Sequence, residues 1–255
     1  MRNLSVSVTA ALLLSASATA ADRGQRNNAS EAMNAREEIR ETHRLAAGAT
    51  VRVEGIAGPV TVETGGGDSA EVHIVRMAAS ERELQCYRTR VEAAPDRLVV
   101  SHVQLEDRPG CDNIRSRQEV RLRLPRAVDL ELSSIAGALE IGAVEGALRL
   151  DSIAGRVRLA GAREARISSL AGGLTLGVGA LGPEGMRISS VVGPVALRFA
   201  PGADASLSAD SVMGSVRGEA IDVVEDEGRY RAQVGDGGPR IAISSVVGSV
   251  RLSRQ

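Results

Sequence analysis

Pairs of small polar residues recur through the second half of the sequence, and their hydroxyl and carboxylate groups could take part in catalysis. Each pair is followed by a branched apolar residue, one further residue and a glycine. The second member is always serine, at Ser134, Ser152, Ser169, Ser190, Ser211 and Ser245. In two copies the first member is an aspartate, Asp151 or Asp210. Two facing carboxylates would suit glycoside hydrolysis.

The spacing of these groups argues against catalysis. In chain order Asp151 and Asp210 lie three copies apart, which is ~14 Å at the usual strand spacing and too far for a carboxylate pair. We interpret them as turn-capping side chains. No histidine follows His102 to act as a base in an acyltransferase of the hexapeptide-repeat type. The second serine of each pair has the parity of the inward apolar residue two positions earlier, which predicts an internal structural ladder of hydroxyls.

The remaining reactive residues predict a disulfide and no metal or cofactor site. Cys86 and Cys111 are the two cysteines, and an even count in an exported protein favours a disulfide. Their spacing is not that of a metal or redox motif. His43, His73 and His102 could converge on one sheet, but separate strand histidines are more often exposed or satisfied by other partners. The glycines at 65–67 precede neither lysine nor helix, which is the pattern of a turn.

The elements that must position these residues are short strands. Each copy reads strand, corner, strand, and a unit this small cannot bury its own apolar face, so the copies must stack. The shared glycines are Gly137, Gly155, Gly172, Gly193, Gly214 and Gly248, with a looser earlier copy ending at Gly58. A glycine at every corner predicts positive φ or close approach to the next coil. The core is aliphatic, because Phe199, Tyr87 and Tyr230 are the only aromatic residues. We therefore predict an all-β fold, a β-solenoid or β-roll of short-strand repeats with a longer-stranded N-terminal portion.

The sequence divides into three parts. Residues 1–20 predict a signal peptide, with Arg2, an apolar run over Val6–Leu14 and a small-residue cleavage site at Ala18–Ala20. Residues 21–35 predict a flexible leader. Residues 36–255 form a single β-repeat domain, with regular coils from about residue 120. Within it, we expect a helical turn capped by Ser80 and a hairpin inserted at Val223–Gly238.

One stretch carries a family resemblance. VRLRLPRAVDLELSSIAGALEI at Val120–Ile141 resembles the adhesin-like β-strand-repeat family of unknown function, of the auto-transporter adhesin head type. Members combine an early strand pair around a G-x-V-x-V turn, here Gly58–Val62, with a strand that ends in proline, here Pro125. The resemblance covers about residues 36–255. It implies an exported β-solenoid or roll and supplies no catalytic residues.

Composition narrows the function classes further. Net charge is −1 with both signs interspersed, which gives no support to nucleic-acid binding. Every basic residue other than histidine is arginine, which either serves anion recognition or reflects codon bias. No segment after the signal is long and apolar enough to span a membrane. We predict an exported, periplasmic or extracellular protein, not an enzyme, with a structural or interaction role at the bacterial cell envelope; the alternative is a glycan-active or glycan-binding β-helix.

Two partner hypotheses follow from the repeats. Outward arginines on one solenoid face are expected to form a ladder that binds an extended envelope or surface partner. They are Arg149, Arg156, Arg158, Arg187, Arg217 and Arg251. The last coil ends at Leu252 without an obvious cap, so either the Val223–Gly238 hairpin covers its edge or two chains associate end to end.

Overall fold

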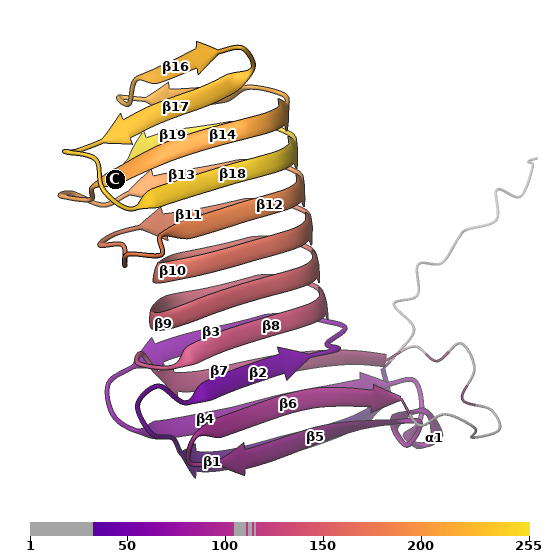
Figure 1. Cartoon of the computed structure of the whole chain (residues 1–255). Coiled ribbons are helices and arrows are strands. Elements are labelled where there is room, and N and C mark those ends of the chain that lie inside the picture. Colours follow the sequence, from indigo (N-terminus) through magenta and orange to yellow (C-terminus); the bar gives the residue numbers. More distant parts are fainter. Residues whose placement is uncertain (1–32, 105–110, 112–113, 115) are drawn as a thin grey trace, which may run out of the picture. The chain divides into compact units, whose positions relative to one another are not determined.

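The computed structural model describes residues 33–104, 111, 114 and 116–255, which belong to one compact unit. The expected signal peptide and most of the expected leader lie outside these residues. The described part of the chain is all-β, with one helix, α1 (Glu81–Leu84). Its strands join into one hydrogen-bonded network (Figure 1).

The network divides into two rows where each coil turns its corner. Row A has the spatial order β5 (Tyr87–Ala94), β6 (Arg97–Gln104), β2 (Thr50–Glu54), β8 (Asp129–Ala136), the second halves of β9 (Leu139–Ala154) and β10 (Val157–Ala171), β12 (Met186–Val192), β18 (Arg240–Val247), β14 (Ala205–Met213), β17 (Arg229–Val234) and β16 (Val223–Asp226). Row B has the order β1 (Ala35–Arg44), β4 (Ser69–Ala78), β7 (Ser116–Pro125), β3 (Val60–Gly65), the first parts of β9 and β10, β11 (Leu174–Val178), β13 (Val195–Phe199), β19 (Val250–Arg254) and β15 (Val216–Glu219).

Alternating side chains from both rows fill one core. In β7, Val120, Leu122 and Leu124 are buried while Arg121 and Arg123 face outward, and the strand ends at Pro125, as the sequence predicts. The buried residues of the two rows form one continuous cluster of valine, leucine, isoleucine and alanine, with Phe199 as its single buried ring. A core this narrow has little room for large rings, which explains the aliphatic composition.

A column of glycines runs along the corners. Gly172 has a φ of 145°, and a Cβ there would lie 1.9 Å from the carbonyl oxygen of Gly155. The same close approach links successive glycines in the order Gly58, Gly137, Gly155, Gly172, Gly193, Gly248 and Gly214. The predicted close approach is therefore confirmed at every corner, and positive φ at every one except Gly137.

This column shows that the coils do not stack in chain order. β18 pairs in parallel with β12 on one side and with β14 on the other, so the last copy lies between the fourth and fifth copies. The N-terminal end is interleaved in the same way, because β2 lies between β6 and β8. The prediction of an open edge at the last coil is therefore wrong, because β18 is paired on both sides. The predicted hairpin is present as β16 and β17, but it covers β14 in antiparallel register.

Crowding at the glycine column predicts a large cost for one added methyl group. Gly172→Ala should lower the free energy of unfolding by about 3 kcal/mol or more, because its Cβ would collide with backbone. The control is Gly202→Ala, where φ is 75° but no atom lies within 4 Å. That change should cost about 1 kcal/mol for the left-handed backbone alone. Urea unfolding measures both, and equal losses would contradict the close approach.

The interleaved order predicts which exposed residues can be cross-linked. Val192 is the register neighbour of Val247, and Val247 is the neighbour of Met213. Val192→Cys with Val247→Cys should therefore form a disulfide under mild oxidation, because the Cα atoms are one strand spacing of ~4.8 Å apart. Val192→Cys with Met213→Cys should not, since they are two spacings apart. Stacking in chain order would give the reverse result in non-reducing electrophoresis.

Candidate interaction surface

The paired serines face the solvent, not the core. All six second serines have φ between 52° and 56°, in the left-handed region, and all six are exposed. The strand register skips this residue: Ser133 pairs with Asp151 and Ile135 with Ile153, leaving Ser134 and Ser152 outside the pairing. One left-handed residue turns two consecutive side chains outward and so resets the alternation. The predicted internal ladder of hydroxyls is therefore wrong.

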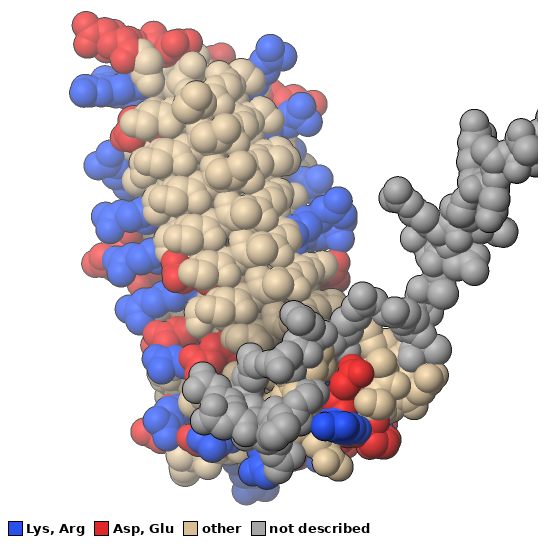
Figure 2. Space-filling view, turned by 90° about the vertical axis from the view of Figure 1, so that its right-hand side faces the viewer, with Lys and Arg blue, Asp and Glu red and all other residues tan. Residues whose placement is uncertain are grey.

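The reset alternation builds a strip of mostly small and apolar residues along the corners, here called the corner strip, in which Asp151 and Asp210 are the charged members of the polar pairs. At its centre is a column of outward apolar residues in the register order Ala57, Ala136, Ala154, Ala171, Val192, Val247 and Met213. Serines lie on one side of this column and the glycines on the other. Figure 2 shows the strip as a mostly tan surface, with basic side chains and some acidic ones along both borders.

Row A supplies one border of the strip through a column of outward charged residues. Arg52, Glu131, Arg149, Arg166 and Arg187 are successive register neighbours. Glu131 accepts hydrogen bonds from Arg52 at 2.7 Å and from Arg149 at 2.8 Å, and these bonds, that of Arg52 foremost, hold the pKa of Glu131 below its usual value. At this end of the column each arginine therefore has a carboxylate partner, although two arginines share one glutamate.

The next two arginines of the column lack such a partner. Neither Arg166 nor Arg187 forms an ion pair with any described residue, although the two are direct register neighbours. They line a hollow of about 230 Å³ with Arg149, Arg240, Glu164 and Glu184. Arg166 is not among the arginines predicted from the sequence. Aligning the copies would have found it, because it stands two residues before its polar pair, as Arg149 and Arg187 do.

Row B supplies the other border of the strip. Arg251 and Arg217 are register neighbours there, and they too lack an ion pair among the described residues. Arg158 also faces outward from this row but is paired with Glu140 at 2.9 Å. Arg156 is exposed at the corner between the rows. The six arginines expected on one face therefore divide between two rows and a corner.

The two aspartates at the corners are further apart than chain order implies. Because the last copy is interleaved, Asp151 and Asp210 are separated by the rungs of Ser168, Ser189 and Ser244. Four strand spacings give about 19 Å, which is incompatible with a glycosidase carboxylate pair. Asp151 accepts a hydrogen bond from the Ser168 hydroxyl at 2.7 Å, and this bond, with a second from Ser152, lowers its pKa. Asp151 thus joins the serine of its own corner to a serine of the next coil, and the turn-capping role stays a prediction.

The three histidines have separate partners. His43 lies 2.8 Å from Glu41, and His73 lies 2.6 Å from Glu38. His102 contacts Gln118 and stacks on Tyr87 with ring centroids 4.7 Å apart. Within the described residues there is no cluster of three or more histidine, cysteine, aspartate or glutamate side chains that could hold a metal ion.

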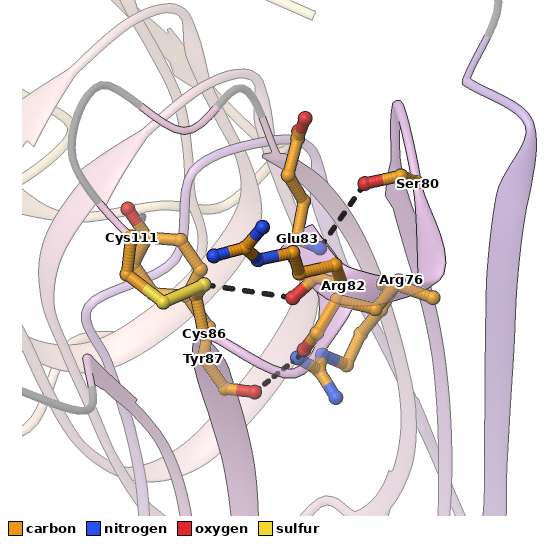
Figure 3. Close-up of a disulfide and its surroundings, with 8 residues drawn as sticks. Arg76, Ser80, Arg82, Glu83, Cys86, Tyr87 and Cys111 are labelled. Atoms are coloured by element: carbon orange, nitrogen blue, oxygen red, sulfur yellow. Dashed lines mark hydrogen bonds between the residues drawn. A yellow bond between two sulfur atoms is a disulfide. The ribbon is translucent and has the colours of Figure 1, made fainter. Parts of the chain in front are cut away.

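The predicted disulfide closes the N-terminal part of the chain. Cys86 and Cys111 are bonded, with Cα atoms 5.6 Å apart (Figure 3). Beside the bond, Ser80 caps α1 by accepting a hydrogen bond from the backbone NH of Glu83 at 3.3 Å, which confirms the predicted cap. The buried Arg76 donates to the carbonyl oxygens of Leu84 and Tyr87, which holds the end of α1. These contacts stabilise the segment around α1 and involve no residue of the corner strip.

Comparisons with known proteins add little to this geometry. No family model and no curated protein matches the sequence. Among solved structures, a candidate cell adhesion protein from Clostridium sporogenes is 14% identical, with a TM-score of 0.39, 86% of this chain covered and 100% of that chain. Candidate adhesins from Bacteroides fragilis and Parabacteroides merdae are 9% and 10% identical, with TM-scores of 0.32 and 0.31, 86% of this chain and 97% and 96% of theirs covered. Similarity at this level establishes neither a shared fold nor a shared function. The described residues contain no helix long and apolar enough to cross a membrane.

The half-buried position of His102 predicts a pH dependence of stability. Burial, and then the charge of Arg76, lower the pKa of His102 to about 4, whereas an unfolded histidine titrates near ~6.5. Between these values the unfolded chain binds a proton that the folded chain does not, so stability falls as pH decreases from about 6.5 towards 4. His102→Gln should reduce that dependence in urea unfolding curves measured across this window. An unchanged slope relative to the wild-type protein would contradict the assignment.

Proposed function

We propose that the protein is an exported, non-enzymatic β-solenoid that binds an extended anionic partner at the cell envelope through the corner strip and its two borders. The repetition of equivalent coils at one strand spacing would let individually weak contacts add along such a partner. Residues 1–20 and the Cys86–Cys111 disulfide support export, since disulfides persist in oxidising compartments. The strand ending at Pro125 and the repeats after it support membership of the adhesin-like β-strand-repeat family.

The main support for the proposal is a set of outward arginines that form no ion pair with a described carboxylate. Most outward arginines of the N-terminal coils have a carboxylate neighbour, as Arg52 and Arg149 have Glu131 and as Arg123 has Glu63 and Glu71. Two pairs on adjacent rungs form no ion pair among the described residues: Arg166 with Arg187, which share their hollow with Glu164 and Glu184, and Arg251 with Arg217. Like charges directly opposite each other destabilise a sheet, so a surface that retains them is suited to an anionic ligand.

The alternative of a glycan-active β-helix fits the geometry less well. Asp151 and Asp210 are too far apart to act on one glycosidic bond, and Asp151 is engaged with two serine hydroxyls. An acidic glycan remains within the proposed class of partner, because its carboxylates could contact the same arginines.

Removing the uncompensated arginines should weaken binding to a soluble polyanion. We expect Arg166→Ser with Arg187→Ser to lower the affinity for heparin, used here as a generic probe. Exposed charge pairs contribute up to about 1 kcal/mol each, so two such losses amount to up to roughly thirtyfold. Fluorescence anisotropy at low ionic strength measures the change, and added salt should reduce binding of the wild-type protein.

A matched control removes the same charge elsewhere. Arg121→Ser with Arg158→Ser deletes two outward arginines of row B that are already paired, with Glu119 and Glu140. This variant should retain most of the affinity. Equal weakening by both variants would show that only net charge matters, and the proposed surface would then be rejected.

A further inference from the structure

The corner strip changes character along the stack. Its first coils carry alanine, at Ala136, Ala154 and Ala171, whereas its last three coils carry Val192, Val247 and Met213. These three large side chains are successive register neighbours, with Val247 between the other two, and are 59%, 47% and 73% exposed. They form a continuous apolar ridge, which is defined here by these three residues.

Exposing the three large apolar side chains of the ridge to water is less favourable in free energy than exposing alanine at the same positions would be. Single exposed apolar residues are normal, but three in register, at the same position in successive coils, make a contiguous patch. The serines beside them have the same backbone geometry in every coil, so the corner itself does not require large side chains. The ridge is therefore suited to an apolar contact.

The charges around the ridge indicate what kind of apolar partner it fits. Arg187 borders the coil of Val192 in row A, while Arg251 and Arg217 border the coils of Val247 and Met213 in row B. None of the three arginines forms an ion pair among the described residues. Two groups of carboxylates lie near the ridge. Asp210 is exposed in the coil of Met213, three residues before it. The run from Glu225 to Glu227 lies in the β16–β17 hairpin beyond that coil, so the contact is centred on the coils of Val192 and Val247.

We propose that the ridge and its bordering arginines contact the surface of an anionic phospholipid bilayer. This inference rests on the proposed function and names the partner of the same surface. Apolar side chains flanked by cations bind at the interface of a bilayer, where the side chains enter the acyl boundary and the cations meet lipid phosphates. A soluble polyanion would satisfy the arginines but would leave Val192, Val247 and Met213 in water.

Flotation of the purified protein with lipid vesicles tests the proposal. We expect binding to vesicles that contain phosphatidylglycerol and little binding to vesicles of phosphatidylcholine alone. Replacing the ridge by Val192→Ser, Val247→Ser and Met213→Ser should reduce partition at least about tenfold, because three apolar contacts are lost. Arg217→Ser with Arg251→Ser should reduce it by about fivefold for each arginine.

The control for the ridge variant lies in the same column. Ala136→Ser, Ala154→Ser and Ala171→Ser make the same number of changes at equivalent positions and should leave partition unchanged. Circular dichroism and urea unfolding establish that all variants are folded. If the ridge variant partitions as the wild-type protein does, the ridge does not contact lipid and the inference is overturned.

The heparin measurement separates this inference from the proposed function. Arginine-dependent heparin binding without any vesicle binding would overturn the bilayer contact and leave the anionic-partner proposal standing. If the protein binds neither heparin nor the vesicles, both the bilayer contact and the anionic-partner proposal are overturned. In the expected case, the ridge variant keeps its heparin affinity and loses its vesicle partition.

Discussion

The close approach of backbones at the corner is the constraint on which the rest of the stack depends. One glycine per coil brings its neighbour's carbonyl oxygen to within about 2 Å of where a Cβ would be, as at Gly155 and Gly172. Only glycine can occupy such a position, so the column fixes where each coil turns from row A to row B. The rungs on either side then fall into parallel register, and the aliphatic residues of both rows meet in one core.

The left-handed serine before each glycine decides which side chains reach the solvent. At Ser169 it breaks the alternation of the strand, so that Ser168 and Ser169 both point outward and Leu170 returns to the core. Because the alternation is shifted by one residue at Ser169, the next side chain to face the solvent is that of Ala171, and the equivalent residue does so in each of the other coils. The corner strip, its alanines and its ridge of Val192, Val247 and Met213 are consequences of that offset.

Interleaving at both ends addresses the exposed edges that a stack of strands creates. The first coil in chain order contains β2 and the last contains β18. Each of these two strands lies one position inside its end of the stack, not at the end itself. The outermost coils are then covered by antiparallel strands, β5 on β6 and β17 on β14, while β4 pairs with β7 and with β1. Charged side chains line these covering strands, among them Glu38 and Arg40 on β1 and Glu225 on β16, and charge on an edge strand opposes pairing with another chain.

The sequence by itself determined the repeat unit, the glycine corners, the Ser80 cap, the inserted hairpin and the Cys86–Cys111 pairing. Each of these depends on residues close together in the chain, or on the compartment that two cysteines imply. It misassigned the paired serines, because a strict period of two does not reveal a left-handed residue inside a strand. Arg166 was not predicted for a different reason: its significance depends on Arg187 being its neighbour and on neither arginine forming an ion pair among the described residues. The order of the coils was decided only by the tertiary structure. Copies with the same apolar pattern have equivalent edges, so local sequence does not distinguish Val247 from Met213 as the neighbour of Val192. That choice comes from long-range pairing at the ends of the stack, which also fixes the surface where the arginines and the apolar ridge come together.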